Sequence, residues 1–227
     1  MARIVQQGII QVAGSGETGV QVNEFEAAIK SVTSSATVGA VFVYDTRNDS
    51  DGGAWRKKCA GLSWYDETLN TATRGGRREF PSVALIVADG ASPDTVSLYD
   101  LDDPAAPLWL QFKRGTASWT AGNMGLTDNN VSSVFALNGR IYIGQAAGSA
   151  LGVEEISFVD DTGYRYTASA TAGGYYNGNI SERLDGKGWA GSHSRGNIVN
   201  GTVNDVAATV LEGAEIGALG LPIPTIG

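Results

Sequence analysis

Three carboxylates and two glycines in one short turn are the best candidate for a metal site. Asp45, Asp49 and Asp51 are followed directly by Gly52 and Gly53. Oxygen ligands that converge from one loop suit Ca²⁺, although the closing glutamate of an EF-hand is missing here. Aspartate and glycine are also ordinary residues of tight turns. We therefore predict no required cofactor and name calcium as the one metal that this turn could bind.

Residues for covalent or acid–base catalysis do not occur in a recognisable pattern. The chain has one histidine, His193, and one cysteine, Cys59, and neither lies in a known nucleophile motif. The GxGxxG stretch over 14–19 is followed by Val-Gln-Val, which favours a strand and not the helix of a nucleotide-binding unit. Glu154 and Glu155 are neighbours on a predicted strand and so point to opposite faces. The sequence predicts a protein that is not an enzyme, with a depolymerase built from distant carboxylates as an alternative.

Basic residues gather in one part of an acidic chain. The formal net charge is −8, yet six of the 16 Lys and Arg residues lie between positions 56 and 78. The overall acidity argues against general nucleic-acid binding. A solvated surface and a contact with an acidic partner subunit both fit the local cluster. We predict that this segment makes assembly contacts through a basic-aromatic set of side chains: Arg56, Lys57, Lys58, Trp64, Tyr65, Arg74, Arg77 and Arg78.

The five tryptophans have two interpretations. Trp55 and Trp109 fall at equivalent positions of an internal repeat, which favours packing in a core. Exposed aromatic rings could instead form a platform that stacks on a sugar, such as a host glycan, or on a base, since a flat ring matches the apolar face of either. The sequence leaves core packing as the main interpretation and a sugar- or base-stacking platform as the alternative.

Composition indicates a soluble, turn-rich protein. Glycine accounts for 31 of the 227 residues, and its tolerance of positive φ suits many tight turns between short strands. One cysteine allows no internal disulfide, so we expect synthesis in a reducing cytoplasm. No apolar run approaches the length of about 20 residues that spans a bilayer, and we expect no membrane insertion.

An internal repeat organises the chain. Tyr44-Asp45 and Tyr99-Asp100 are each followed by an acidic turn and a tryptophan segment, and a weaker copy runs over 156–166. Each copy predicts a β-hairpin. The Asn138-Gly139 pair between two apolar runs is a strong hairpin signal, so residues 131–168 are expected to form four antiparallel strands. Short helices are expected over 23–32 and 65–73.

Four strands at a spacing of about 50 residues are typical of a β-propeller blade. We predict an all-β chain of antiparallel, blade-like repeats that forms a partial β-propeller or one completed by oligomerisation, with a β-sandwich as the alternative. The chain is expected to be a single domain of about three and a half units. Its divisions are an N-terminal segment (1–35), unit 1 with the basic-aromatic insert (36–80), unit 2 (81–120), unit 3 (121–170), a loop (171–201) and the start of unit 4 (202–227).

Three motifs resemble virion structural proteins of marine tailed bacteriophages. They are DTRNDSDGGAWR at 45–56, WYDETLNTATRGGRREFP at 64–81 and VNDVA at 203–207, and the resemblance runs from about residue 36 onward. It implies a virion-associated, propeller-like protein and supplies no catalytic residues. Family members continue past the position of Ile226 into further blades. We therefore expect either a shortened version or a subunit that assembles with copies of itself.

The functional expectation follows from this resemblance. It is a structural subunit of a tailed-phage virion, in the tail, its hub or an appendage. We expect a homo-oligomer with other virion proteins as partners, made in the host cytoplasm and located in the virion. The alternative is a receptor- or glycan-binding module of the adsorption apparatus.

Overall fold

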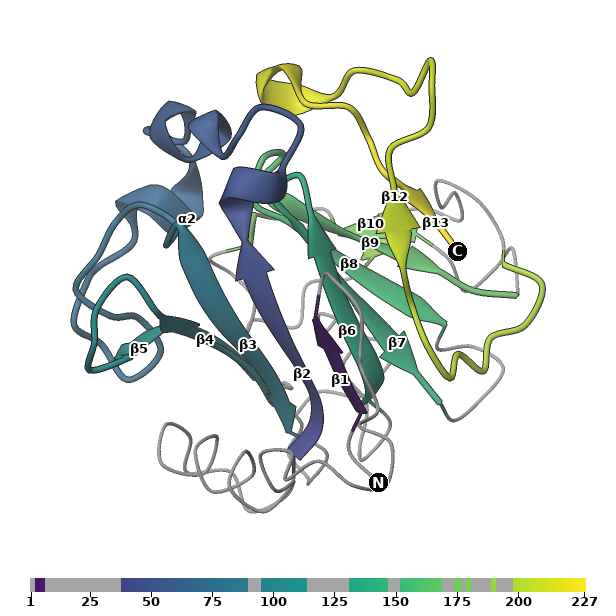
Figure 1. Cartoon of the computed structure of the whole chain (residues 1–227), viewed down its shortest axis with the longest axis horizontal. Coiled ribbons are helices and arrows are strands. Elements are labelled where there is room, and N and C mark those ends of the chain that lie inside the picture. The colour runs from purple at the N-terminus through teal and green to yellow at the C-terminus, as the bar shows by residue number, and fades with distance from the viewer. Residues whose placement is uncertain are drawn as a thin grey trace, which may run out of the picture.

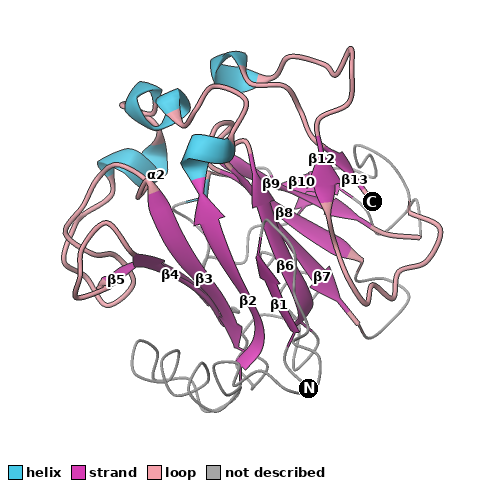
Figure 2. Ribbon diagram, in the orientation of Figure 1, coloured by secondary structure: helices cyan, strands magenta, loops and turns pink. Residues whose placement is uncertain are grey.

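Two sheets contain most of the described strands in the computed structural model (Figure 1). The structure describes residues 3–6, 38–89, 95–113, 131–146, 152–168, 174–176, 179–180, 189–190 and 198–227. The described chain is mostly β with little helix, as Figure 2 shows, so the all-β prediction is confirmed. The short helices are η1 (Thr46–Asn48), η2 (Ala54–Lys58), α2 (Ser63–Asp66) and η5 (Ala218–Gly220). None of the described helices is long and apolar enough to cross a membrane.

The first sheet has the order β1-β2-β3-β4-β5. Its four antiparallel strands are β2 (Val38–Asp45), β3 (Val83–Asp89), β4 (Thr95–Asp100) and β5 (Leu108–Lys113), and β1 (Arg3–Gln6) pairs with β2 in parallel. The second sheet has the order β11-β10-β9-β8-β7-β6. Its strands are β6 (Val131–Leu137), β7 (Arg140–Gln145), β8 (Val153–Ser157), β9 (Thr162–Tyr166), β10 (Gly174–Tyr176) and β11 (Trp189–Ala190). A two-stranded ribbon joins β12 (Ala208–Thr209) to β13 (Thr225–Ile226).

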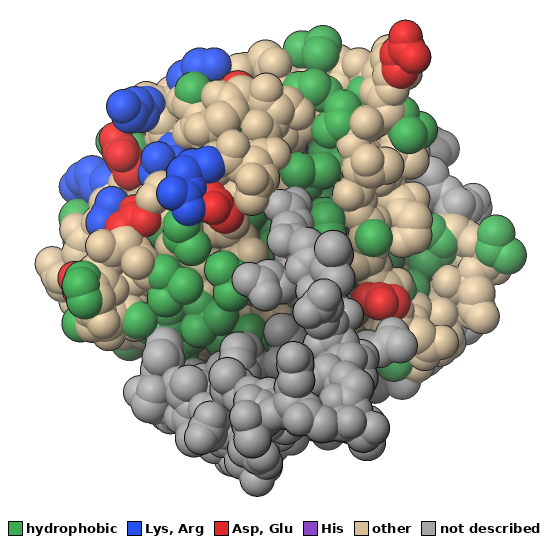
Figure 3. All heavy atoms as spheres, in the orientation of Figure 1, with side chains coloured by type: hydrophobic (Ala, Val, Ile, Leu, Met, Phe, Trp, Pro, Cys, Tyr) green, Lys and Arg blue, Asp and Glu red, His purple; other side chains and the backbone are tan. Residues whose placement is uncertain are grey.

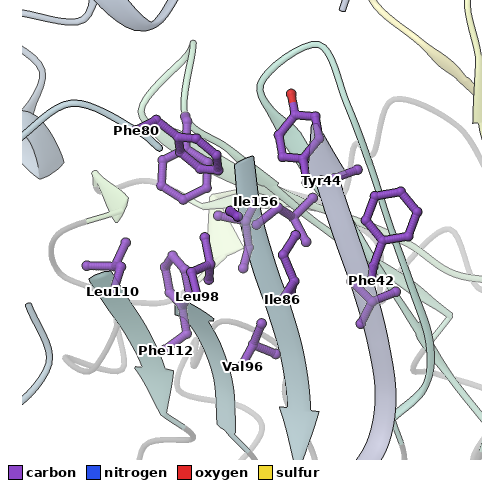
Figure 4. Packing of buried hydrophobic residues seen from close by; sticks show 14 of the residues in the cluster. Phe42, Tyr44, Phe80, Ile86, Val96, Leu98, Leu110, Phe112 and Ile156 are labelled. Atoms are coloured by element: carbon purple, nitrogen blue, oxygen red, sulfur yellow. The ribbon is translucent and has the colours of Figure 1, made fainter. Parts of the chain in front are cut away.

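The two sheets enclose one hydrophobic core. Alternate residues of β2 and β3, such as Phe42 and Ile86, point into it, because neighbouring residues of a strand face opposite sides (Figure 4). Phe42 meets Phe135 of β6 with ring centroids 5.1 Å apart. Ile156 of β8 reaches the same core from the second sheet. The two sheets therefore share a single core that neither sheet could form alone.

The opposite face of each sheet has its own apolar residues. On the second sheet, Tyr142 and Tyr166 pack against Val203 and Val206 of the C-terminal segment, residues 198–227. The backbone N–H of Val203 donates to Gln145 O (2.9 Å), which fixes this segment along β7. On the first sheet, a separate cluster lies on the other side from the main core and contains Val41, Leu85, Val87 and Tyr99. The chain thus covers the outer face of its second sheet with its own C-terminal segment.

Several hairpin predictions are confirmed. Residues 131–166 form the four antiparallel strands β6 to β9, and β4 pairs with β5. Asn138 and Gly139 both have positive φ, 52° and 70°, as a two-residue hairpin turn requires. Two packed sheets, each with four consecutive antiparallel strands (β2 to β5 and β6 to β9), are compatible with adjacent blades, but the described residues do not form a closed propeller.

Other details of the prediction are wrong. The Ala54–Lys58 stretch is a 3₁₀-helix and not a returning strand, because Gly52 and Gly53 turn the chain with positive φ before it. The hairpin partner of β2 is β3, so the division at residue 80 cuts through one sheet. In the predicted unit 4, the strands are only the two-residue β12 and β13, and one isolated bridge joins Ile216 to Pro222.

The predicted helices and the long predicted loop also differ from the structure. The helix expected over 65–73 lies instead at Ser63–Asp66. The long loop expected over 171–201 contains the short strands β10 and β11. The helix expected over 23–32 and the GxGxxG stretch over 14–19 lie outside the described residues.

Gly139 and Gly52 test how tightly the sheets pack. Both have positive φ (+70° and +65°), so alanine at either position costs about 1 kcal/mol of backbone strain. A Cβ at Gly139 would lie 2.6 Å from Val159 Cγ1, whereas a Cβ at Gly52 would meet nothing within 4 Å. We expect Gly139→Ala to destabilise the chain by about 1–3 kcal/mol more than Gly52→Ala, as measured by urea denaturation. Equal losses would contradict the tight packing of this turn.

Candidate assembly surface

Exposed basic side chains occupy one corner of the molecule. Among the described side chains, every Lys or Arg that is not buried falls between residues 47 and 78. Figure 3 shows them gathered over the short helices that follow β2. Acidic side chains lie among them. The six residues, called the basic corner below, are Arg47, Arg56, Lys57, Lys58, Arg77 and Arg78.

The loop that displays part of the basic corner is fixed by the buried carboxylate of Asp49. Asp49 Oδ2 accepts hydrogen bonds from Tyr44 Oη (2.6 Å) and Trp55 Nε1 (2.7 Å). Asp49 Oδ1 accepts from the backbone N–H of Asn138 (2.7 Å), which lies in the β6–β7 turn of the other sheet. A buried carboxylate is costly unless it is hydrogen-bonded, and here three donors supply those bonds.

The Asn138 side chain extends this network in two directions. Its Oδ1 accepts from the backbone N–H of Ser50 (2.8 Å), and its Nδ2 donates to Pro222 O (2.9 Å) in the C-terminal segment. The backbone N–H of Gly139 donates to Tyr44 Oη (2.8 Å). We call Tyr44, Asp49, Trp55, Asn138 and Gly139 the Asp49 network. It joins the first sheet, the second sheet and the C-terminal segment at one point.

Two further tryptophans attach loops to the core. Trp64 Nε1 donates to Phe158 O (2.9 Å), and Trp109 Nε1 donates to Arg77 O (2.9 Å). Trp55, Trp64 and Trp109 are at most 1% exposed, which confirms core packing for these three. They are therefore not available for stacking on a glycan, and the side chains of Trp119 and Trp189 lie outside the described residues.

Two of the predicted contact residues, Trp64 and Arg74, are buried within the chain and do not present their side chains at its surface. Trp64 is 0% exposed and Arg74 is 1% exposed. The Arg74 guanidinium lies 4.4 Å from the centre of the Trp109 ring and donates to Arg78 O (2.9 Å). These contacts stabilise the folded loop, since a cation over an aromatic face is attracted to it most strongly when both are desolvated. Tyr65 is half-buried against the core.

Half of the basic corner is already paired with carboxylates. Arg77 binds Asp100 (2.5 Å) and Asp102 (3.2 Å). Arg47 binds Asp45 (2.6 Å), which lowers the pKa of that carboxyl group through a side-chain hydrogen bond.

Lys58 approaches Asp51 at 3.8 Å and donates to Leu219 O (3.3 Å). The other three cations have no ion pair among the described residues. Arg56 donates to Phe80 O (2.8 Å) and Arg78 to Tyr65 O (3.0 Å), so both guanidinium groups are oriented by backbone carbonyls. Lys57 is exposed.

The three carboxylates predicted as calcium ligands have separate partners. Asp45 binds Arg47, Asp49 lies within its network, and Asp51 accepts from the backbone N–H of Gly53 (3.0 Å). Within the described ranges, no three His, Cys, Asp or Glu side chains lie together in a way that could hold a metal ion. The structure therefore does not bring these three residues together as one ligand set.

The other candidate chemical groups are also used inside the fold. Glu154 pairs with Arg165 (3.3 Å), and burial raises the pKa of the Glu154 carboxyl group to about 7. Glu155 accepts from Tyr166 Oη (2.6 Å) and pairs with Arg140 (3.1 Å), so the neighbouring glutamates have different partners, as their alternation on a strand predicts. Burial raises the pKa of the Cys59 thiol to about 12. His193 lies outside the described residues.

Comparison of the chain with protein-family models, with curated proteins and with solved structures finds no match. The interpretation of the surface therefore depends on its own geometry. Sequence reasoning omitted Arg47, whose side chain is 69% exposed, although it lies in the same acidic turn as the predicted calcium ligands.

Arg74 and Arg78 separate structural from surface arginines. Arg74→Ala removes a buried cation and leaves the Arg78 carbonyl without its donor, and we expect a loss of about 2–4 kcal/mol in the free energy of unfolding. Arg78→Ala changes an exposed side chain and is expected to stay within about 0.5 kcal/mol of the native chain. Denaturation curves of the two variants give the comparison. An Arg74→Ala variant of native stability would show that the buried guanidinium contributes little.

Asp49 predicts a specific pH dependence. Burial raises its pKa from 3.8 to about 6, against the opposing effect of its hydrogen bonds. The folded chain therefore binds this proton more tightly than the unfolded chain. The resulting stabilisation is complete below about pH 4 and is lost as the pH rises through about 6.

Asp49→Asn removes this titration. The stability of the native chain relative to the variant is expected to fall by about 3 kcal/mol between pH 4 and pH 7. Urea denaturation of both proteins at several pH values measures the difference, and the exposed Asp103→Asn change provides the control. A difference that does not vary with pH would contradict the raised pKa.

Proposed function

We propose that this chain is a structural subunit of a tailed-phage particle, in the tail, its hub or an appendage, and that it acts by assembling with other virion proteins. The observation that carries the proposal is a charged surface displayed on loops that buried side chains hold in place. Arg56 and Arg78 are oriented by backbone carbonyls, and Lys57 lies beside Arg56 on η2. A surface that is ordered before binding loses less entropy when a partner docks.

The phage assignment rests on the resemblance of the three sequence motifs, two of which build this surface. Residues 45–56 contain the Asp49 turn and the start of η2, and residues 64–81 contain most of α2 and the loop that ends at Phe80. Both motifs combine residues that fix the loop with residues that remain exposed. This combination is what an assembly contact needs, because specificity requires both a defined shape and accessible groups.

The covered outer face of the second sheet bears on how assembly occurs. The C-terminal segment occupies the face on which the next blade of a propeller would pack. We infer that contacts with partners use the loops at the end of the sheets and not a further sheet laid on this face. The proposal thus differs in geometry from a ring completed blade by blade.

Particle composition tests the proposal. Particles purified from cultures that produce this chain are expected to contain it in fixed stoichiometry by mass spectrometry, and an antibody to the chain is expected to label them at one location. The double variant Lys57→Ala, Arg78→Ala is expected to fold normally and to be depleted from particles by about tenfold. The matched control is Thr202→Ala, Thr209→Ala, which changes exposed side chains elsewhere. Absence of the native chain from particles would overturn the virion assignment.

A further inference from the structure

An ordered loop of the C-terminal segment exposes apolar and acidic side chains together. Leu211 is 53% exposed and Ile216 is 62% exposed, and they are two of four large apolar residues that are exposed among the described residues. Glu212 and Glu215 lie between them and are exposed as well. We call residues 211–216 the acidic-apolar loop.

The acidic-apolar loop has a defined shape. The backbone N–H of Ala214 donates to Leu211 O (3.1 Å), and the N–H of Ile223 donates to Glu215 O (2.8 Å). Gly213 turns the chain with a φ of 74°. At the base of the loop, Leu221 is fully buried, and the carbonyl oxygen of Pro222 accepts a hydrogen bond from Asn138 Nδ2. Burial and hydrogen bonding therefore hold two apolar side chains in water, which is unfavourable for an isolated chain.

The charges of this loop complement the basic corner. Neither Glu212 nor Glu215 forms an ion pair among the described residues, and neither do Arg56, Lys57 and Arg78. In the common view of Figures 1 and 3, a loop of the C-terminal segment projects at the upper right with an acidic side chain at its tip. The basic side chains gather at the upper left. One copy thus presents the two complementary groups at separate corners of the same end.

We propose that the acidic-apolar loop of one copy docks on the basic corner of a second copy. The proposal names the partner within the assembly function and rests on that function. Glu212 and Glu215 meet the unpaired cations, and Leu211 and Ile216 lose their exposure to water against the neighbouring copy. The exposed Leu101 adjoins Asp100, the residue that binds Arg77, and so offers an apolar group beside the basic corner. Because the two surfaces differ, the contact either closes a reciprocal dimer, in which each loop meets the other copy's corner, or runs head-to-tail into a ring or a filament.

Charge reversal tests the contact without changing the core. The loop variant is Glu212→Lys, Glu215→Lys, and the corner variant is Lys57→Glu, Arg78→Glu. Light scattering at low salt is expected to find oligomers of the native chain and monomers of each variant alone. A mixture of the two variants is expected to form oligomers again, because each loop then meets an opposite charge on the other protein. Raising the salt concentration is expected to weaken all of these complexes.

Two further double variants of the chain complete the test. Thr202→Lys, Thr209→Lys adds positive charge to the same segment outside the loop and is expected to leave the oligomer intact. Leu211→Ser, Ile216→Ser is expected to weaken association by about tenfold or more with unchanged charge. A native chain that stays monomeric, or variants whose mixture stays monomeric, would overturn the proposal. Particles that contain a monomeric chain would refute this contact alone, and oligomers absent from particles would refute only the virion role.

Discussion

The carboxylate of Asp49 is the constraint on which the arrangement of the two sheets depends. Its two oxygens accept from Tyr44 at the end of β2, from Trp55 in η2 and from the turn at Asn138 in the second sheet. Removing any donor would leave a buried carboxylate oxygen short of a hydrogen bond, so the three elements are held together. Apolar packing between sheets is tolerant of small shifts, whereas these hydrogen bonds are directional. The Asp49 network therefore fixes one relative position of sheets that the core alone would hold more loosely.

The loops beyond the sheets depend on the same kind of bond. Trp64 and Trp109 each bury a large ring and donate one N–H to a backbone carbonyl of a loop, and Arg74 stacks on Trp109. Two arginines of this loop have different roles: Arg74 is buried and stabilises the loop, whereas Arg78 is exposed at its surface. The buried side chains determine where the exposed ones lie. An ordered charged surface is thus a consequence of aromatic packing underneath it.

Local patterns predicted the parts of this fold that are decided locally. Alternation and the Asn138-Gly139 turn identified β6 to β9 of the second sheet, since a two-residue hairpin brings its own partners together, whereas β10 and β11 lie in a stretch predicted as a loop. The pairing of β2 with β3 could not be predicted in this way, because 37 residues, 46–82, separate them. The role of Asp49 as a buried hydrogen-bond acceptor could not be predicted from the sequence either. An aspartate beside glycines suggests a metal or a turn, and only the distant Asn138 N–H and the Trp55 ring show it to be a buried acceptor. Burial of Arg74 depends in the same way on a strand far along the chain.

The segments that cover the faces of the second sheet limit which surfaces of this chain can contact a partner. A sheet with two apolar faces needs a cover on each face, and the second sheet receives the core on one face and the C-terminal segment on the other. Displacing that segment would break the bond from Asn138 to Pro222 and expose Tyr142 and Tyr166 together. Contact through the ends of the sheets requires no such loss, because the side chains there are exposed in advance. The same segment that closes the sheet face also carries the acidic-apolar loop, so covering the core and offering a contact are two consequences of one path of the chain.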